Sequence, residues 1–200
     1  MRASEKTRRL TGLALLTAIV AVLQVVASFV KFGPFSITLA LAPILIGAAL
    51  YGPKAGAYLG GVFGVVVLIA CILGWDPGGN ALWNANPFLT ACICLVKGIA
   101  AGLAAGVVYR AIAGKSLAHG TMMAGSIVAG IVSPVVNTGL FVLCLSLLFH
   151  DILVTWAAGS ELVYYVIFTL TGINFVLELV INLVLSTVIV RVVGARGYAR

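Results

Sequence analysis

The sequence predicts an all-α integral membrane protein, a bundle of six transmembrane helices with both termini on the cytoplasmic side. Hydrophobic residues make up 62% of the 200 positions and charged residues 8%, and the mean hydropathy is +1.22. Soluble domains do not reach such values. Within a bilayer, backbone polar groups are satisfied only in helices or closed barrels. The long apolar runs lack the alternation of barrel strands, so a helical bundle is expected.

The six spans follow from the lengths of the apolar runs, because about 20 residues cross the apolar core of a bilayer. The first run is too long for the core of a signal peptide and is followed directly by further spans, so we expect it to be a mature helix. No Pro-, Ser- or charge-rich linker interrupts the runs, which indicates a single domain over residues 1–200. The expected spans are residues 10–30, 36–51, 54–73, 88–112, 120–149 and 162–193.

Positive charges support this topology, because Lys and Arg accumulate in cytoplasmic loops. Of the twelve Lys and Arg, all except Lys31 and Lys97 lie at the termini or in the loops that hold Lys54, Arg110 and Lys115. The net charge of +7 is therefore assigned to topology and to anionic lipid of the plasma membrane. No basic stripe with interleaved aromatics suggests a nucleic-acid partner.

Small residues form stripes on three spans. The third span carries Gly56, Gly60 and Gly64 and the fourth has an equivalent stripe from Gly98 to Gly106. Small residues at this spacing let helices approach closely in lipid, so we expect both stripes to mediate internal packing. The first span carries a shorter pair, Ala14 and Ala18, which could pack inward or face a partner protein.

Ionisable residues inside the membrane are expensive and mark candidate functional sites. Lys97 lies roughly 13 Å from the outer end of its span, too deep to reach the interface easily. Glu178 shares one helical face with Asn174 and Asn182. Asn137 on the fifth span lies at a similar depth. Three helices are therefore expected to present polar groups to one interior layer.

Two interpretations of this layer are open. Lys97 and Glu178 could form a buried structural pair that holds the bundle in register. Alternatively, they could line a pocket open to the outside, where Lys97 binds an anionic group and the asparagines bind hydroxyls or amides. Gln24, one turn from Ser28 near the outer end of the first span, could complete the rim.

The external connection over residues 74–88 is rich in Gly, Pro, Asn and Trp. Turn chemistry and interfacial Trp anchors explain part of it. It also leads directly into the span that carries Lys97, so it is a candidate lid. The lid residues would be Asn80, Asn84 and Asn86, which can hydrogen-bond a polar ligand, and Trp75 and Trp83, which can cover its apolar part.

No motif for catalysis is present. The chain lacks a phosphate-binding loop, an HExxH helix and a GxSxG elbow. Its four cysteines all lie in expected spans without zinc-type spacing, and they are interpreted as buried, reduced thiols. We therefore expect a binding or transport protein, not an enzyme, with no metal and no cofactor.

The chain resembles a known family, the substrate-binding S components of energy-coupling factor (ECF) vitamin transporters. The resemblance is carried by the six-span topology, the Ala14-x-x-x-Ala18 pair, and the stretch SITLALAPILIGAALYGPKAGAYLGGVFG over residues 36–64 with its short YGPKAG turn. It covers nearly the whole chain.

The resemblance implies a subunit that captures an extracellular vitamin with high affinity. It would then dock on a module of one transmembrane T component and two ATPase subunits, topple in the membrane and release the vitamin inside, while the partners hydrolyse ATP. Ala14 and Ala18 would let the scaffold approach closely, and residues 31–35 and 74–87 would gate the pocket. Pantothenate is favoured, with folate, riboflavin and niacin open. The alternative function is a self-sufficient secondary carrier or channel that uses Lys97 and Glu178.

Overall fold

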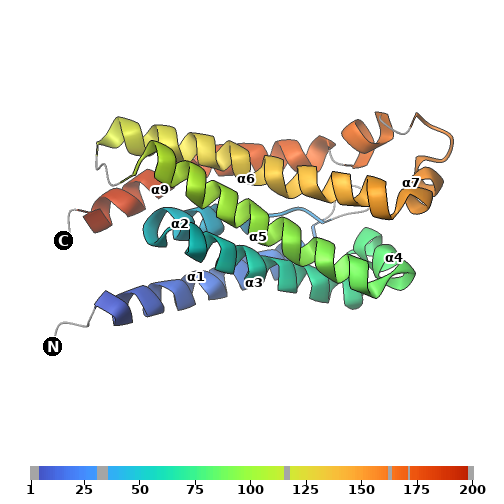
Figure 1. Cartoon of the computed structure of the whole chain (residues 1–200), viewed down its shortest axis with the longest axis horizontal. Helices are drawn as coiled ribbons and strands as arrows, with labels where there is room; N and C mark the ends of the chain where they lie inside the picture. The colour runs from blue at the N-terminus through green and yellow to red at the C-terminus, as the bar shows by residue number, and fades with distance from the viewer. Residues whose placement is uncertain (1–4, 31–35, 115–117, 162–163, 171, 198–200) are drawn as a thin grey trace.

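Four long apolar helices form the frame of the protein in a computed structural model (Figure 1). The structure describes residues 5–30, 36–114, 118–161, 164–170 and 172–197. Within these ranges, four helices are long and apolar enough to cross a membrane. Four of the expected spans are thereby confirmed as helices: α1 (Glu5–Ala27), α3 (Pro53–Ile72), α5 (Pro87–Ile112) and α6 (His119–Leu148).

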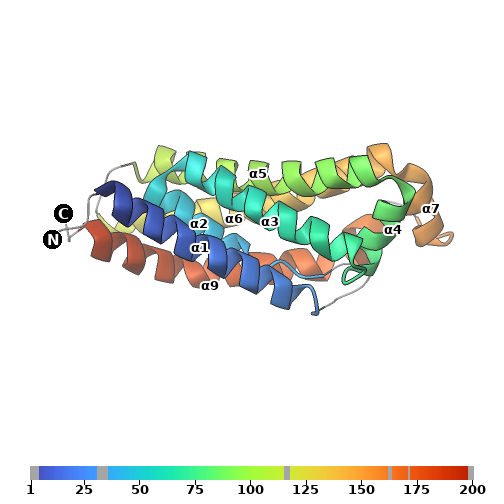
Figure 2. The same ribbon diagram turned by 90° about the horizontal axis from the view of Figure 1, so that it is seen from below.

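The helices run lengthwise, so that the bundle has two distinct ends. The start of α1 and the end of α9 (Gly172–Gly197) lie at one end, and the short helices α4 (Pro77–Ala85) and α7 (His150–Ala157) lie at the other (Figures 1 and 2). Many large apolar side chains are exposed along the frame, among them Leu15, Val96 and Leu147. Exposed apolar side chains in such number suit contact with lipid.

The second expected span is helical only in part. Residues 36–51 were expected to be one helix, but α2 begins at Leu41 and ends at Tyr51. Pro43 lies in its first turn, where a missing N–H is harmless, and its ring would clash with the carbonyl of a preceding helical turn. The chain before α2, with Ile37 and Thr38 buried, is therefore not helical. Non-helical backbone at membrane depth is tolerated where protein covers it.

The last expected span, 162–193, is also not one regular helix. A π-helical segment, η1 (Tyr165–Leu170), precedes α9. Within α9 the apolar stretch Phe175–Leu185 is shorter than a full span. The count of six spans and the cytoplasmic location of both termini thus stay predictions.

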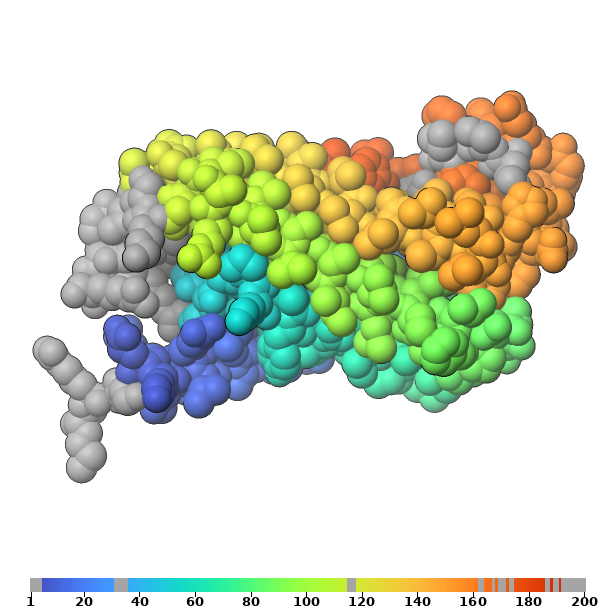
Figure 3. Space-filling model, viewed as in Figure 1, coloured from blue at the N-terminus to red at the C-terminus, as the bar shows by residue number. Residues whose placement is uncertain are grey.

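Two connections between the long helices contain short helices: α4 lies within the connection expected over residues 74–88, and α7 follows α6. α4 begins at the N-cap Asp76, whose side chain accepts a hydrogen bond from the Gly79 N–H, and Pro77 occupies its first turn. Asp at the N-cap and Pro at the first helical position are typical of helix starts. α7 ends at Ala158 in a left-handed conformation with φ 48°. Figure 3 shows α4 in green and α7 in orange at the same end of the molecule.

The glycine stripes of α3 and α5 face each other, which confirms that they pack internally. A Cβ added to Gly60 would collide with the carbonyl oxygen of Gly98, and one added to Gly56 would collide with that of Gly102. The backbones are therefore in direct contact along two turns. This contact is the most extensive between any two of the described helices.

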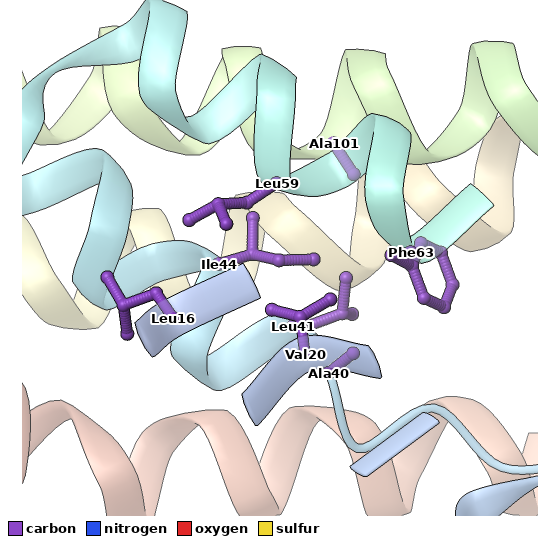
Figure 4. Packing of buried hydrophobic residues seen from close by; sticks show 8 residues of the cluster. All are labelled: Leu16, Val20, Ala40, Leu41, Ile44, Leu59, Phe63 and Ala101. Carbon is purple, nitrogen blue, oxygen red and sulfur yellow. The ribbon is translucent and has the colours of Figure 1, made fainter. Parts of the chain in front are cut away.

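A buried hydrophobic cluster joins this pair to the first two helices. In Figure 4, Leu16 and Val20 of α1 and Leu41 and Ile44 of α2 lie against the α3 side, with Phe63 at one end of the cluster. Val20, Leu41, Ile44 and Phe63 are fully buried. The cluster fixes α2 and the segment before it against the α3–α5 pair.

The glycine contact predicts a sharp difference between neighbouring substitutions. Gly60→Ala is expected to lower Tm in detergent, by the equivalent of about 1–3 kcal/mol for overpacking, because its methyl group meets backbone. Gly61→Ala is the matched control, since its Cβ would lie 3.5 Å from the flexible Ile99 side chain. Thermal unfolding of both variants measures the difference. Equal Tm values would show that α3 and α5 are not in backbone contact.

Candidate functional site

A pocket lies among the long helices next to α4. The empty space within it, open solvent at its mouth included, is about 760 Å³. Helices α1, α3, α4, α5, α6 and α9 and the segment before α2 all contribute to the wall. Its apolar part includes Phe63, Leu82, Ile93 and Phe141, and its polar part includes Gln24, Thr38, Asp76, Lys97, Asn137 and Glu178.

Lys97 is the one cation among the described residues that line this pocket. It is half-buried on α5, and its Nζ lies 4.7 Å from the centroid of the Phe141 ring on α6. A cation over an aromatic face is stabilised by the ring quadrupole. The neighbouring Gly98 packs on the backbone of Gly60, so the glycine contact also fixes the position of the lysine.

Glu178 and Asn137 form the polar wall contributed by α9 and α6. Both side chains are buried, with exposed fractions of 4% and 3%. Thr38 and Asn137 lie beside the Glu178 carboxylate, and the charge of Lys97 acts on it from further away. No ion pair within 4.0 Å joins Lys97 to Glu178 in the described part of the chain. The two charges therefore share the pocket without closing on each other.

Gln24 approaches the same pocket from α1. It is 3% exposed and lines the pocket together with Ser36 and Thr38. One turn further on, the Ser28 hydroxyl donates to the Gln24 carbonyl oxygen at 2.8 Å. The structure thus brings together four residues that the sequence analysis singled out: Gln24, Lys97, Asn137 and Glu178.

Asp76 joins three segments at the edge of the pocket. Its Oδ1 accepts from the Gly79 N–H at 2.8 Å, and its Oδ2 accepts from the Ser36 N–H at 3.0 Å. The Ser36 hydroxyl in turn donates to the Ser28 carbonyl oxygen at 3.1 Å. One buried carboxylate therefore holds α4, the segment before α2 and the end of α1. Sequence analysis assigned Asp76 only to a turn, although Asp-Pro is also a helix N-cap signal.

The three asparagines of the expected lid make hydrogen bonds within α4 and to its neighbouring backbone instead of lining the pocket. Asn80 Nδ2 donates to the Cys71 carbonyl oxygen at 2.8 Å, and Asn84 Nδ2 donates to Asn80 Oδ1 at 3.1 Å. Asn86 Oδ1 accepts from the Leu89 N–H at 3.1 Å and caps α5. None of the three lines the pocket. Their amides hold α4 and the start of α5 in place.

The two tryptophans also lie outside the pocket lining. The Trp75 ring packs on Phe29, with centroids 5.3 Å apart, and Trp83 is half-buried on α4. The sequence placed these residues correctly in the segment above Lys97. Of the residues in that segment, however, Asp76, Gly79 and Leu82 are the ones that reach the pocket wall.

The remaining residues that the sequence singled out do not line the pocket among the described residues. Asn174 lies in α9, but its side chain is outside the described residues, as is the expected gating segment 31–35. Asn182 is buried and donates to the Glu178 carbonyl oxygen at 2.8 Å. Ala14 and Ala18 lie on the exposed side of α1, opposite the buried residues of that helix.

Two pocket residues on α5, Thr90 and Cys94, were not among the residues expected at the site. Thr90, Cys94 and Lys97 recur at helical spacing and all line the pocket, so the i, i+4, i+7 rule could have found the first two. The four cysteines are free thiols. Among the described residues, no group of three or more His, Cys, Asp or Glu could hold a metal ion.

Comparison with known proteins identifies the family. Residues 8–190 match the family described as the ECF transporter, substrate-specific component. The chain belongs to this family. It is thus a membrane-embedded substrate-binding component of a transporter. No curated protein is significantly similar to it.

A solved structure supports the fold. The chain resembles the crystal structure of the S component for biotin from an ECF-type ABC transporter, with a TM-score of 0.58 and 18% identity. The alignment covers 96% of this chain and 94% of that one. The two proteins therefore share the S-component fold over almost their whole lengths.

The contacts of Asp76 predict how α4 is held. Asp76→Asn replaces one acceptor oxygen with an NH₂ group that faces an N–H donor, so one of the two hydrogen bonds is expected to break, at a cost of about 1 kcal/mol. Hydrogen exchange of the Ser36 and Gly79 amides should become faster. Asp151→Asn, at an exposed acid in the first turn of α7, is the control. If the exchange rates of the Ser36 and Gly79 amides are unchanged in Asp76→Asn, the Asp76 side chain does not hold these two segments.

Proposed function

We propose that this ECF S component captures a small carboxylated vitamin from outside the cell and delivers it inward after docking on an ATP-driven module. The module would consist of a transmembrane T component and two ATPase subunits, which hydrolyse the ATP. Family membership supports the transport role. The observation that carries the ligand assignment is Lys97, the one cation among the described lining residues, held over Phe141.

The position of Lys97 favours an anionic ligand. Its side chain is half-buried and has no carboxylate partner within 4.0 Å among the described residues. Charge-assisted hydrogen bonds to a carboxylate are stronger than neutral ones, and the apolar wall around the lysine strengthens them further. A cationic vitamin such as thiamine would meet like charge at this position.

Pantothenate is the vitamin we favour. It combines one carboxylate with an amide and hydroxyl groups, which match a lysine surrounded by amide and hydroxyl side chains. Biotin is also a carboxylate, and the S component for biotin shares this fold, but fold similarity alone does not transfer a ligand. Folate and niacin carry carboxylates too, whereas riboflavin has none. A co-purifying ligand identified by mass spectrometry would distinguish among them.

The exposed side of α1 supports the docking role of Ala14 and Ala18. They are small, lie one turn apart and are exposed, while bulky apolar side chains such as Leu15 and Ile19 flank them. Small residues allow the backbone of a partner helix to approach closely within lipid. A T-component helix is the partner that the transport role requires.

Removal of the Lys97 charge is expected to weaken carboxylate binding without ATP or partners present. Lys97→Met should lower affinity for the favoured vitamin at least tenfold, because a hydrogen bond to a charged group contributes about 1.5–3 kcal/mol. Isothermal titration of the purified protein measures this. Lys54→Met, at an exposed lysine outside the pocket, is the control. Equal affinities would exclude Lys97 from the site.

Bulk on the exposed side of α1 is expected to separate binding from uptake. Ala14→Trp and Ala18→Trp should retain vitamin binding and lose at least tenfold in ATP-dependent uptake, because the indole keeps a partner helix away. Val107→Trp, on the exposed side of α5, is the control. Normal uptake by the Ala14→Trp and Ala18→Trp variants would disprove the docking site.

Uptake by this chain alone in liposomes under a pH gradient would instead favour a secondary carrier using Lys97 and Glu178.

A further inference from the structure

Three buried side-chain oxygens at the pocket have no hydrogen-bond partner. They are Gln24 Oε1, Asn137 Oδ1 and Glu178 Oε2, and each has less than 1 Å² of accessible surface. They belong to three different helices, α1, α6 and α9, and all three residues line the pocket. Buried polar atoms are nearly always hydrogen-bonded. Of the six such oxygens on the described residues, these three surround one pocket, where a ligand that carries donors would satisfy them together.

The chemistry of these atoms limits what that group can be. All three are acceptors, and an amide oxygen or a carboxylate oxygen binds N–H or O–H donors. The other pocket carboxylate, Asp76, does not belong to this set, because both of its oxygens already accept from backbone N–H groups. The pocket therefore has an acceptor subsite formed by Gln24, Asn137 and Glu178, separate from the cationic side at Lys97.

We infer that the ligand is a carboxylic acid whose other part carries N–H or O–H donors, with the acceptor subsite of Gln24, Asn137 and Glu178 selecting for those donors. This inference rests on the proposed function for the carboxylate, which Lys97 binds. The donor requirement is additional, and it comes from the unpartnered oxygens alone. A site built to bind donors rejects an analogue that lacks them, because its own polar groups then stay unpaired.

The requirement divides the candidate vitamins. Pantothenate has hydroxyl and amide donors, and biotin has two ureido N–H groups. Nicotinate is a carboxylate whose ring nitrogen is only an acceptor, so it cannot satisfy the subsite. Glu178 sharpens the selection, because a carboxylate binds donors more strongly than an amide does and repels a second ligand carboxylate.

The test compares acids that differ in donors. Pantothenate and its di-O-methylated derivative, which loses both hydroxyl donors and keeps only the amide N–H, form one pair. Biotin and lipoate form another, since lipoate keeps the same carboxylate arm without N–H groups. We expect a donor-bearing acid to bind at least tenfold more tightly than its counterpart by isothermal titration. Equal affinity within the pair that binds, or tightest binding of nicotinate, would overturn the inference. A protein that binds none of these acids would overturn the proposed ligand class as well.

Variants of the subsite assign the selectivity to its residues. Asn137→Leu and the conservative Glu178→Gln should each reduce affinity for the donor-bearing acid at least tenfold. Neither substitution should change the affinity for its counterpart with fewer donors. Ser133→Ala is the matched control, because the Ser133 hydroxyl is equally buried and unpartnered on α6 but does not line the pocket. Thermal unfolding checks that each variant is folded.

The variants also distinguish the two proposals. Lys97→Met should weaken both members of a pair alike, since both carry the carboxylate. Loss of selectivity in the Asn137 and Glu178 variants supports the inference, whereas selectivity that persists in both refutes it. If Lys97→Met has no effect while selectivity depends on Asn137 and Glu178, the carboxylate assignment fails and the acceptor subsite stands.

Discussion

Backbone contact between α3 and α5 is the constraint on which the rest of the structure depends. With Gly60 and Gly98 in contact, no side chain can separate the two helices, and the residues beside the glycines take fixed directions. Lys97 precedes Gly98, and Phe63 packs against Gly98 on the facing side. Both line the pocket. The stripe that satisfies helix packing in lipid therefore also positions the charge that defines the site.

The pocket separates its two kinds of polar groups. A cation in a low-dielectric environment is stabilised by an aromatic ring or a carboxylate, and Lys97 has Phe141. The Glu178 carboxylate lies beside the side chains of Thr38 and Asn137. If the two charges closed on each other, each would satisfy the other and a ligand would have to compete with that pair. No ion pair joins them in the described residues, so a ligand with the proposed carboxylate and donor groups would not have to break one.

Much of this could be predicted from the sequence. Hydropathy identified the four long helices, and GxxxG spacing identified the α3–α5 contact, because both depend on local patterns. Gln24, Lys97, Asn137 and Glu178 were placed at one site because polar residues in apolar spans are rare enough to stand out. These patterns are strong in membrane proteins, where each polar residue in a span requires an explanation.

The rest depended on tertiary contacts. The amides of Asn80, Asn84 and Asn86 and the indoles of Trp75 and Trp83 were expected to cover a ligand. Instead α4 forms in this segment, and Asn80 and Asn86 satisfy backbone groups. Composition alone does not distinguish an amide that binds a ligand from one that caps a helix. Thr90 and Cys94 were missed because small polar side chains are common in spans and give little signal. The partial helicity of residues 36–51 depended on the position of Pro43 within the first turn.

The double hydrogen bond of Asp76 has a kinetic consequence. Because one carboxylate holds both Ser36 and the start of α4, a movement of either segment shifts the anchor of the other. Their movements are therefore coupled. If a bound molecule leaves past these segments, its residence time depends on this single side chain even though Asp76 provides none of the unpartnered oxygens. Tight capture and slow escape can in this way be adjusted independently of the groups that recognise the ligand.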